Sequence, residues 1–185
     1  MVLVARGSTA GEHMSRSRYA ALIGVGMMIV STLGVSCASS TERTSASVNC
    51  VFDAAQSLGP IVNSSKFEGS PTVSADETSL FFTSARYGQE DLFASIRADR
   101  KSPWGDPVNL GDSVNSSIGD DFSPRLAMDG NTLYFGSNRE GGFGAADLYV
   151  TTRESPKHLW VNLGPVVNTT SFEGFPTPTA DGNTL

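Results

Sequence analysis

Apolar and polar positions divide this chain into three regions. Residues 19–35 carry no charge and are mostly small or apolar, and residues 38–47 are rich in Ser and Thr. After residue 56, no stretch repeats its apolar residues at helical spacing, and short apolar runs alternate with Gly, Asp and Asn. That alternation predicts β-strands joined by tight turns. We therefore divide the chain into an upstream extension with a signal peptide (1–36), a tether (37–57) and a repeat domain (58–185).

The third region contains an internal repeat. The segment LGPIVNSS at 58–65 returns as LGDSVNSS at 110–117 and as LGPVVNTT at 163–170, so successive units begin 52 and 53 residues apart. LFFTSAR at 80–86 likewise matches LYFGSNR at 133–139. Repeats of this length are typical of stacked supersecondary units. We predict three tandem units, beginning at residues 58, 110 and 163.

Each complete unit contains four short segments with strand character. In the first unit they lie at 70–74, 80–84, from Asp91 onward and at 108–110. In the second unit, Asp129-Gly130 supplies a favoured hairpin turn between the first two segments. Four antiparallel strands in a tandem unit predict an all-β fold of β-propeller blades, with two complete blades and a partial third. Closed propellers have roughly 4–8 blades, so we expect an unclosed ring and a fragment of a longer protein.

Unit two carries the family resemblance. SPRLAMDGNTLYF at 123–135, followed by SNR at 137–139 and GGFGAADLY at 141–149, resembles the WD-like repeat of TolB-type β-propellers. Unit one departs from this pattern, because Asp76-Glu77 replaces Asp-Gly and its second loop is shorter. The resemblance implies a periplasmic or outer-membrane protein, in a family sometimes joined to an OmpA-like peptidoglycan-binding domain.

The N-terminal region has the organisation of an export signal. Arg16 and Arg18 precede the uncharged stretch 19–35, which ends at Ser36-Cys37. LGVSC at 33–37 resembles a lipoprotein lipobox and implies lipidation of Cys37, with the polar segment behind it as a tether. An uncleaved anchor and ordinary signal cleavage are the alternatives. By the same resemblance, Ala38 implies an outer-membrane lipoprotein that faces the periplasm.

Composition excludes several other classes of function. The formal net charge of −6 and the pI near 4.8 argue against nucleic-acid binding, which needs a basic surface. The chain has two cysteines and two histidines, His13 and His158, which are too few and too far apart for a disulfide scaffold or a His-rich centre. We therefore expect no cofactor, no bound metal and no catalytic residue in this chain.

Three acids recur at one position of the repeat. Glu68, Asp121 and Glu173 each lie three residues before the proline of the first strand. The first strand of a propeller blade is the innermost, so these carboxylates are candidates for an acidic ring at the channel mouth that binds a cation or a basic group. The alternative is that each accepts hydrogen bonds from nearby backbone N–H groups.

Two Arg–Asp pairs flank the turn between the second and third strands. Arg86 precedes Asp91, and Arg139 precedes Asp147, across loops of different length. A catalytic residue is needed once, whereas a structural brace is needed in every blade. We therefore predict that these four residues brace the blade and that each arginine bonds its aspartate or the local turn carbonyls.

Together these features favour an envelope-anchored, non-enzymatic propeller. Its expected role is a scaffold for envelope proteins or a module that binds peptidoglycan-associated material, held at the membrane by its lipid. The alternative is the propeller portion of a carbohydrate-active or peptidase-type enzyme whose catalytic residues lie beyond Leu185. A surface adhesin is a third class.

Overall fold

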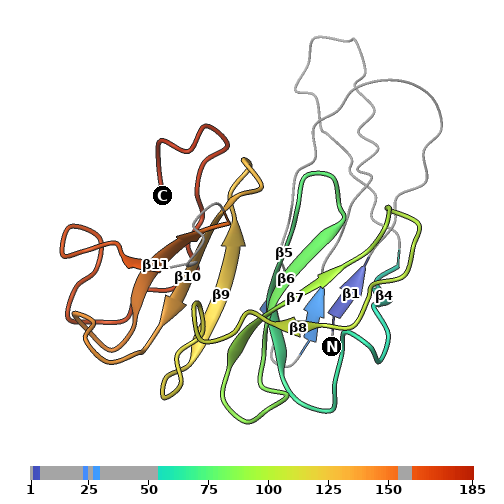
Figure 1. Cartoon of the computed structure of the whole chain (residues 1–185), viewed down its shortest axis with the longest axis horizontal. Coiled ribbons are helices and arrows are strands. Elements are labelled where there is room, and N and C mark those ends of the chain that lie inside the picture. The colour runs from blue at the N-terminus through green and yellow to red at the C-terminus, as the bar shows by residue number, and fades with distance from the viewer. Residues whose placement is uncertain (1, 5–22, 25–26, 30–53, 154–159) are drawn as a thin grey trace, which may run out of the picture.

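The two complete sequence units form two four-stranded antiparallel sheets in a computed structural model of the chain (Figure 1). The strand order in each sheet follows the chain, so each sheet is a simple meander. Sheet one contains β5 (Glu68–Val73), β6 (Ser79–Ser84), β7 (Asp91–Ile96) and β8 (Val108–Asn109). Sheet two contains β9 (Asp121–Leu126), β10 (Thr132–Ser137), β11 (Asp147–Thr152) and β12 (Val161–Asn162). The predicted all-β fold of propeller blades is confirmed.

The structure describes residues 2–4, 23–24, 27–29, 54–153 and 160–185. A further small sheet, in the order β2-β3-β1-β4, joins β1 (Val2–Val4), β2 (Ile23–Gly24), β3 (Met27–Ile29) and β4 (Gln56–Ser57). Within these ranges there is no helix long and apolar enough to cross a membrane. Cys37 and most of the predicted signal peptide lie outside the described residues, so their assignment stays a prediction.

The first hairpin of each unit closes through the same turn. Ser74 N–H donates to Ser79 O at 2.9 Å, and Ala127 N–H donates to Thr132 O at 2.8 Å. An aspartate caps each turn, and hydrogen bonds from Ser74 and Thr78 lower the pKa of Asp76 to about 2. The next residue has a positive φ, which Gly adopts freely in unit two but which Glu77 adopts at 62° in unit one.

The third unit has this turn but not the strands of the expected opening hairpin. Thr179 N–H donates to Thr184 O at 2.8 Å, as in the other two turns. Among the described residues after β12, however, no strand is formed, and a single parallel bridge joins Phe172 to Ala146. A turn closes through local hydrogen bonds, whereas a strand needs a ladder with a neighbour, so the expected hairpin is corrected to its turn alone.

The main core lies between the two sheets. Phe81 and Leu92 of sheet one pack in one cluster with Leu133, Phe135 and Tyr149 of sheet two. Because successive strand residues face opposite sides, Phe82 enters a second cluster on the other face of sheet one. Full burial of such side chains contributes about 1.5–3 kcal/mol each. The aromatic residues of β6 and β10 thus supply much of the core, with Phe81, Phe82 and Phe135 all buried.

Backbone N–H groups of β9, the innermost strand of blade two, donate to threonine hydroxyls on β6 and on β5, the innermost strand of blade one. Ser123 N–H donates to Thr83 Oγ1 at 3.0 Å, and Leu126 N–H donates to Thr72 Oγ1 at 3.3 Å. Each strand has a register shift before its proline, where Ser70 and Ser123 adopt positive φ values. The polar residues that begin β5 and β9 are thereby placed beside the turns that join successive units.

Candidate functional site

Two of the three recurring acids begin the first strands of their blades and are buried. Glu68 is the first residue of β5 and Asp121 the first of β9, with 2% and 0% of their surfaces exposed. Each carboxylate accepts the backbone N–H of the residue that follows the asparagine of the joining turn. These bonds are Ser64 N–Glu68 at 2.9 Å, Ser116 N–Asp121 at 2.5 Å and Thr169 N–Glu173 at 2.9 Å. This geometry favours the backbone-acceptor alternative over an acidic ring, because Glu68 and Asp121 are not open to solvent.

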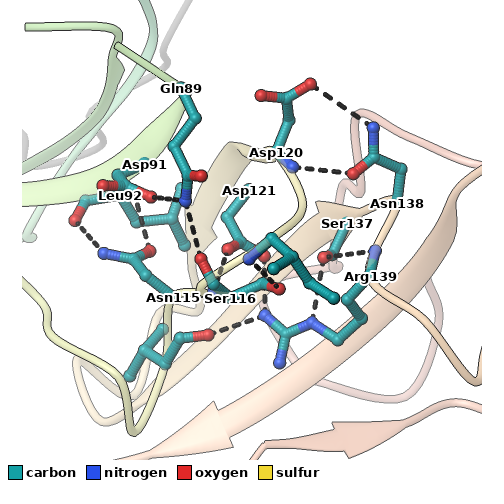
Figure 2. A network of polar contacts seen from close by, with 12 residues as sticks. Gln89, Asp91, Leu92, Asn115, Ser116, Asp120, Asp121, Ser137, Asn138 and Arg139 are labelled. Atoms are coloured by element: carbon teal, nitrogen blue, oxygen red, sulfur yellow. Dashed lines mark hydrogen bonds and ion pairs between the residues drawn. The ribbon is translucent and has the colours of Figure 1, made fainter. Parts of the chain in front are cut away.

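Arg139 completes the arrangement around Asp121, as Figure 2 shows. Its Nη2 lies 2.6 Å from Asp121 Oδ1 and donates to Val114 O at 2.7 Å, while its Nε donates to Ser137 Oγ at 2.9 Å. Both charged side chains are almost fully buried. The partner that the sequence predicted for Arg139, Asp147, is replaced by the acid at the start of the blade.

Arg86 makes the equivalent contacts in blade one. Its Nη2 donates to Val62 O at 2.8 Å, its Nε donates to Ser84 Oγ at 2.9 Å, and Nη2 lies 3.6 Å from Glu68 Oε1. Its predicted partner Asp91 is again not the group it contacts. The arginine extends backward to the joining turn rather than forward across its own loop, so a pairing inferred from closeness in sequence fails. We call each such group of acid, arginine and turn an acid–arginine clamp.

Aromatic rings cover each guanidinium. The Arg139 guanidinium lies 4.8 Å from the Tyr149 ring centroid and 4.4 Å from that of Trp160. Arg86 lies 4.9 Å from the Phe93 centroid. Rings in this position attract the cation and exclude water, which strengthens the hydrogen bonds beneath them. Trp160 therefore packs within its own blade, against Arg139 and Tyr149.

Asp91 and Asp147 accept hydrogen bonds from groups other than the arginines. Asp147 accepts hydrogen bonds from Phe143 N–H at 2.7 Å and from Asn162 Nδ2 at 2.7 Å. Asp91 accepts a hydrogen bond from Asn109 Nδ2 at 2.8 Å. Each aspartate thus connects the third strand of its blade to the fourth, and in blade two also closes the Gly-rich loop.

The asparagine of each joining turn is the site residue that sequence reasoning missed. Asn115 accepts Leu92 N–H at 2.9 Å and donates from Nδ2 to Leu92 O at 3.0 Å (Figure 2). Asn168 makes the same pair of bonds with Leu148, at 2.8 and 3.1 Å. Each therefore holds the third strand of the preceding blade. Its recurrence in every unit was visible, but a preference for turns does not reveal where the amide points.

Further bonds cross directly between the blades. Gln89 Nε2 donates to Ser116 O at 2.7 Å, and Asp121 N–H donates to Glu90 O at 2.7 Å. Glu90 is half-buried, and burial together with the charge of Asp120 raises the pKa of its carboxyl. The joining turn therefore belongs to both blades at once.

Burial dominates the electrostatics of Asp121. It raises the pKa of the carboxyl, and hydrogen bonds from Ser116 and Arg139 offset only part of that effect. An acid or base in catalysis needs a lone pair or proton that substrate can reach, whereas these carboxylate oxygens are directed at buried donors. In the described part of the chain, no group of three or more His, Cys, Asp or Glu is placed to hold a metal ion.

Comparison with known proteins adds little to this picture. No family model matches the sequence, and no curated protein matches it. Among solved structures, TolB from Acinetobacter baumannii is similar, with 21% sequence identity and a TM-score of 0.45 over 62% of this chain. The chain spans 24% of the length of that structure.

Proposed function

We propose that this protein is a non-enzymatic, envelope-anchored β-propeller that scaffolds protein interactions or binds cell-wall material. In this proposal, a lipid on Cys37 holds it at the outer membrane, facing the periplasm. The segment 37–57 tethers the blades to the membrane. Its partners are envelope proteins or peptidoglycan-associated material.

The use of the recurring polar side chains supports this proposal. Acid, arginine, aspartate and asparagine perform the same structural task in each complete blade, and their polar atoms are directed at one another. These residues therefore build a rigid frame and leave recognition to other side chains.

The joining turns also carry exposed apolar side chains. Phe67, Ile118 and Phe172 follow the Asn-Ser or Asn-Thr step of successive turns and are 46%, 69% and 55% exposed. Equivalent turns lie at the same end of their blades, so these side chains belong to one end of the molecule. Aromatic and apolar residues gathered at one end are typical of protein-binding surfaces. This is the observation that carries the proposal.

Site-specific photo-crosslinking in a bacterial host with an outer membrane tests the proposal. A photoreactive phenylalanine at Phe172 or Ile118 should give discrete adducts with envelope proteins or peptidoglycan fragments, and the same probe at exposed Lys101 should not. A fatty-acid label should enter the parent but not Cys37→Ser. Equal adducts at all three positions, or equal labelling of Cys37→Ser, would contradict the proposal. Release of soluble fragments from purified cell wall would favour the enzyme instead.

A further inference from the structure

A cavity of about 300 Å³ lies between the two blades, and Val114, whose carbonyl accepts Arg139 in the clamp of blade two, forms part of its lining. Its size falls at the lower end of the roughly 300–1,000 Å³ typical of ligand pockets. Ile96 and Arg153, both exposed, lie at its rim and open it to solvent. Its walls are mostly apolar, with Phe81 and Ala94 from sheet one and Leu126 and Leu133 from sheet two.

The equivalent space in unit one contains an indole ring. Trp104 is 8% exposed and packs in one cluster with Val73 and Leu80, which are the counterparts of Leu126 and Leu133. The Arg97 guanidinium lies 4.3 Å from the Trp104 ring centroid. Neighbouring Gly105 is fixed on β7, because its N–H donates to Ile96 O at 2.9 Å and its carbonyl accepts Ser95 Oγ at 2.6 Å.

Unit two does not place a tryptophan there. Ten residues separate Arg97 from Val108 in unit one, but seven separate Arg153 from Val161 in unit two. Trp160 lies directly before β12 and packs on Arg139 and Tyr149 instead. The cavity is thus the unit-two counterpart of the Trp104 position.

The arginine at the rim also has a different environment in unit two. Arg97 donates from Nε to Glu77 O at 2.7 Å and lies 3.8 Å from the Glu77 carboxylate. Gly130 occupies the Glu77 position in unit two and offers no carboxylate. Arg153 lies 5.2 Å from the Phe81 ring centroid and forms no ion pair with any residue the structure describes. Unit two therefore presents a cation beside an apolar cavity, at the position where unit one holds an aromatic ring.

From this contrast we infer that the inter-blade cavity binds a small planar aromatic carboxylate. The ring lies against Leu126 and Leu133, where unit one places Trp104, and the carboxylate pairs with Arg153, where unit one places Glu77. The cavity recognises the shape of the ring and does not require a ring N–H. The precedent for this is unit one, where Trp104 Nε1 is buried without a hydrogen-bond partner. The inference stands apart from the scaffold proposal, since it concerns a different surface.

Calorimetric titration of the full chain with three probes tests this inference. Indole-3-propionate supplies ring and carboxylate, indole supplies the ring alone, and tryptamine supplies the ring with a cation. We expect indole-3-propionate to bind about tenfold or more tightly than tryptamine, the effect of one charge-assisted bond. Arg153→Gln should remove that preference without changing the affinity for indole, and the charge-matched Lys101→Gln should leave all three affinities unchanged.

A second variant and an NMR measurement place the ligand. Ala94→Phe, with its fold checked by circular dichroism, should abolish binding by filling the cavity. Nuclear Overhauser contacts should join the bound ring to the methyl groups of Leu126 and Leu133. The inference is overturned if folded parent protein shows no saturable binding, or if Arg153→Gln keeps the preference. It is equally overturned if side chains of residues 154–159 contact those methyl groups in the free protein.

Discussion

In the clamps of both blades a carboxylate accepts the equivalent backbone N–H of the joining turn, but the two blades use different acids. Blade one uses Glu68, which lies five residues after Asn63, and blade two uses Asp121, which lies six residues after Asn115. The third unit has the same acid and the same spacing as the first, with Glu173 five residues after its asparagine. A longer turn thus accompanies a shorter acid. The position of the carboxylate is what the blade requires, and turn length and side-chain length compensate for each other.

The two clamps differ in tightness as well. The closest charged contact is 2.6 Å between Arg139 and Asp121 but 3.6 Å between Arg86 and Glu68. Both acids accept a serine hydroxyl from the second strand of their blade, Ser84 for Glu68 and Ser137 for Asp121, but Glu68 also accepts the Ser64 hydroxyl at 2.5 Å. The buried charge of Asp121 therefore depends more on its ion pair than that of Glu68, which neutral hydrogen-bond donors stabilise to a greater extent.

The largest effect should come from removing the guanidinium of blade two. Arg139→Ala leaves Asp121 buried without its cation, which typically costs about 3–5 kcal/mol of unfolding free energy. Arg86→Ala should cost less, because its ion pair is longer and Glu68 keeps both the N–H and the hydroxyl of Ser64 as donors. Urea denaturation of both variants, with exposed Lys101→Ala as control, measures the difference. Equal losses would show that the two clamps are energetically alike despite their geometry.

The next effect concerns the asparagines, where the two blades agree. Asn115→Ala removes the acceptor of the buried Leu92 N–H, at about 1–3 kcal/mol for that group, while the Leu92 carbonyl keeps its bond from Leu110 N–H at 3.0 Å. Asn168→Ala does the same to Leu148. Thermal unfolding and amide hydrogen exchange should show matching losses, with faster exchange centred on the third strand of the preceding blade. Faster exchange in the following blade would contradict the assignment.

A smaller effect should come from exchanging the lengths of acid and turn. Asp121→Glu overpacks the clamp, and deletion of exposed Ile118 draws the turn away from it, each costing about 1 kcal/mol or more. The combined variant restores the five-residue spacing of unit one. Its loss of unfolding free energy should be smaller than the sum of the losses in the two single variants. A double-mutant cycle measures this difference. Strict additivity would mean that turn and acid do not compensate for each other.

The smallest effect is electrostatic and belongs to unit one alone, since Ala146 takes the Glu90 position in unit two. Burial and Asp120 raise the pKa of Glu90. The folded state therefore favours the protonated form of Glu90. Ionised Glu90 lowers the stability of the protein at pH values above its folded pKa, and this cost is absent below its unfolded pKa of 4.5. Glu90→Gln should stabilise the protein by less than about 1 kcal/mol at pH 7 and leave it unchanged at pH 3. Glu140→Gln, at an exposed site, is the control across a pH series of melting temperatures.

The fold could be predicted from the sequence because every blade repeats the same local signals. The spacing of the repeat and the Asp-Gly turn located the hairpins, and β6 begins at Ser79, one residue before its predicted start. The last unit was overpredicted, since its turn is encoded locally but its strands require a partner.

The candidate residues could be found in the sequence, but their contacts could not. Arg139 and Asp147 are neighbours along the chain, while its true partner Asp121 is distant in sequence and adjacent only after β9 pairs with β10. Asn115 escaped notice for a related reason, because its amide reaches Leu92 only once two sheets are packed. Recurrence identifies a residue as structural, whereas tertiary packing decides which group it contacts.

A joint shared by two blades has an evolutionary consequence. The turn between units carries the asparagine that grips the blade before it and the acid that begins the blade after it. A duplicated segment of 52 or 53 residues therefore already contains the asparagine and the acid that attach it to the neighbouring blades. No new interface has to arise by mutation. Unequal crossing-over within such a gene can lengthen or shorten the array by whole blades. Genetic drift then acts on blade number separately from the side chains exposed on each turn.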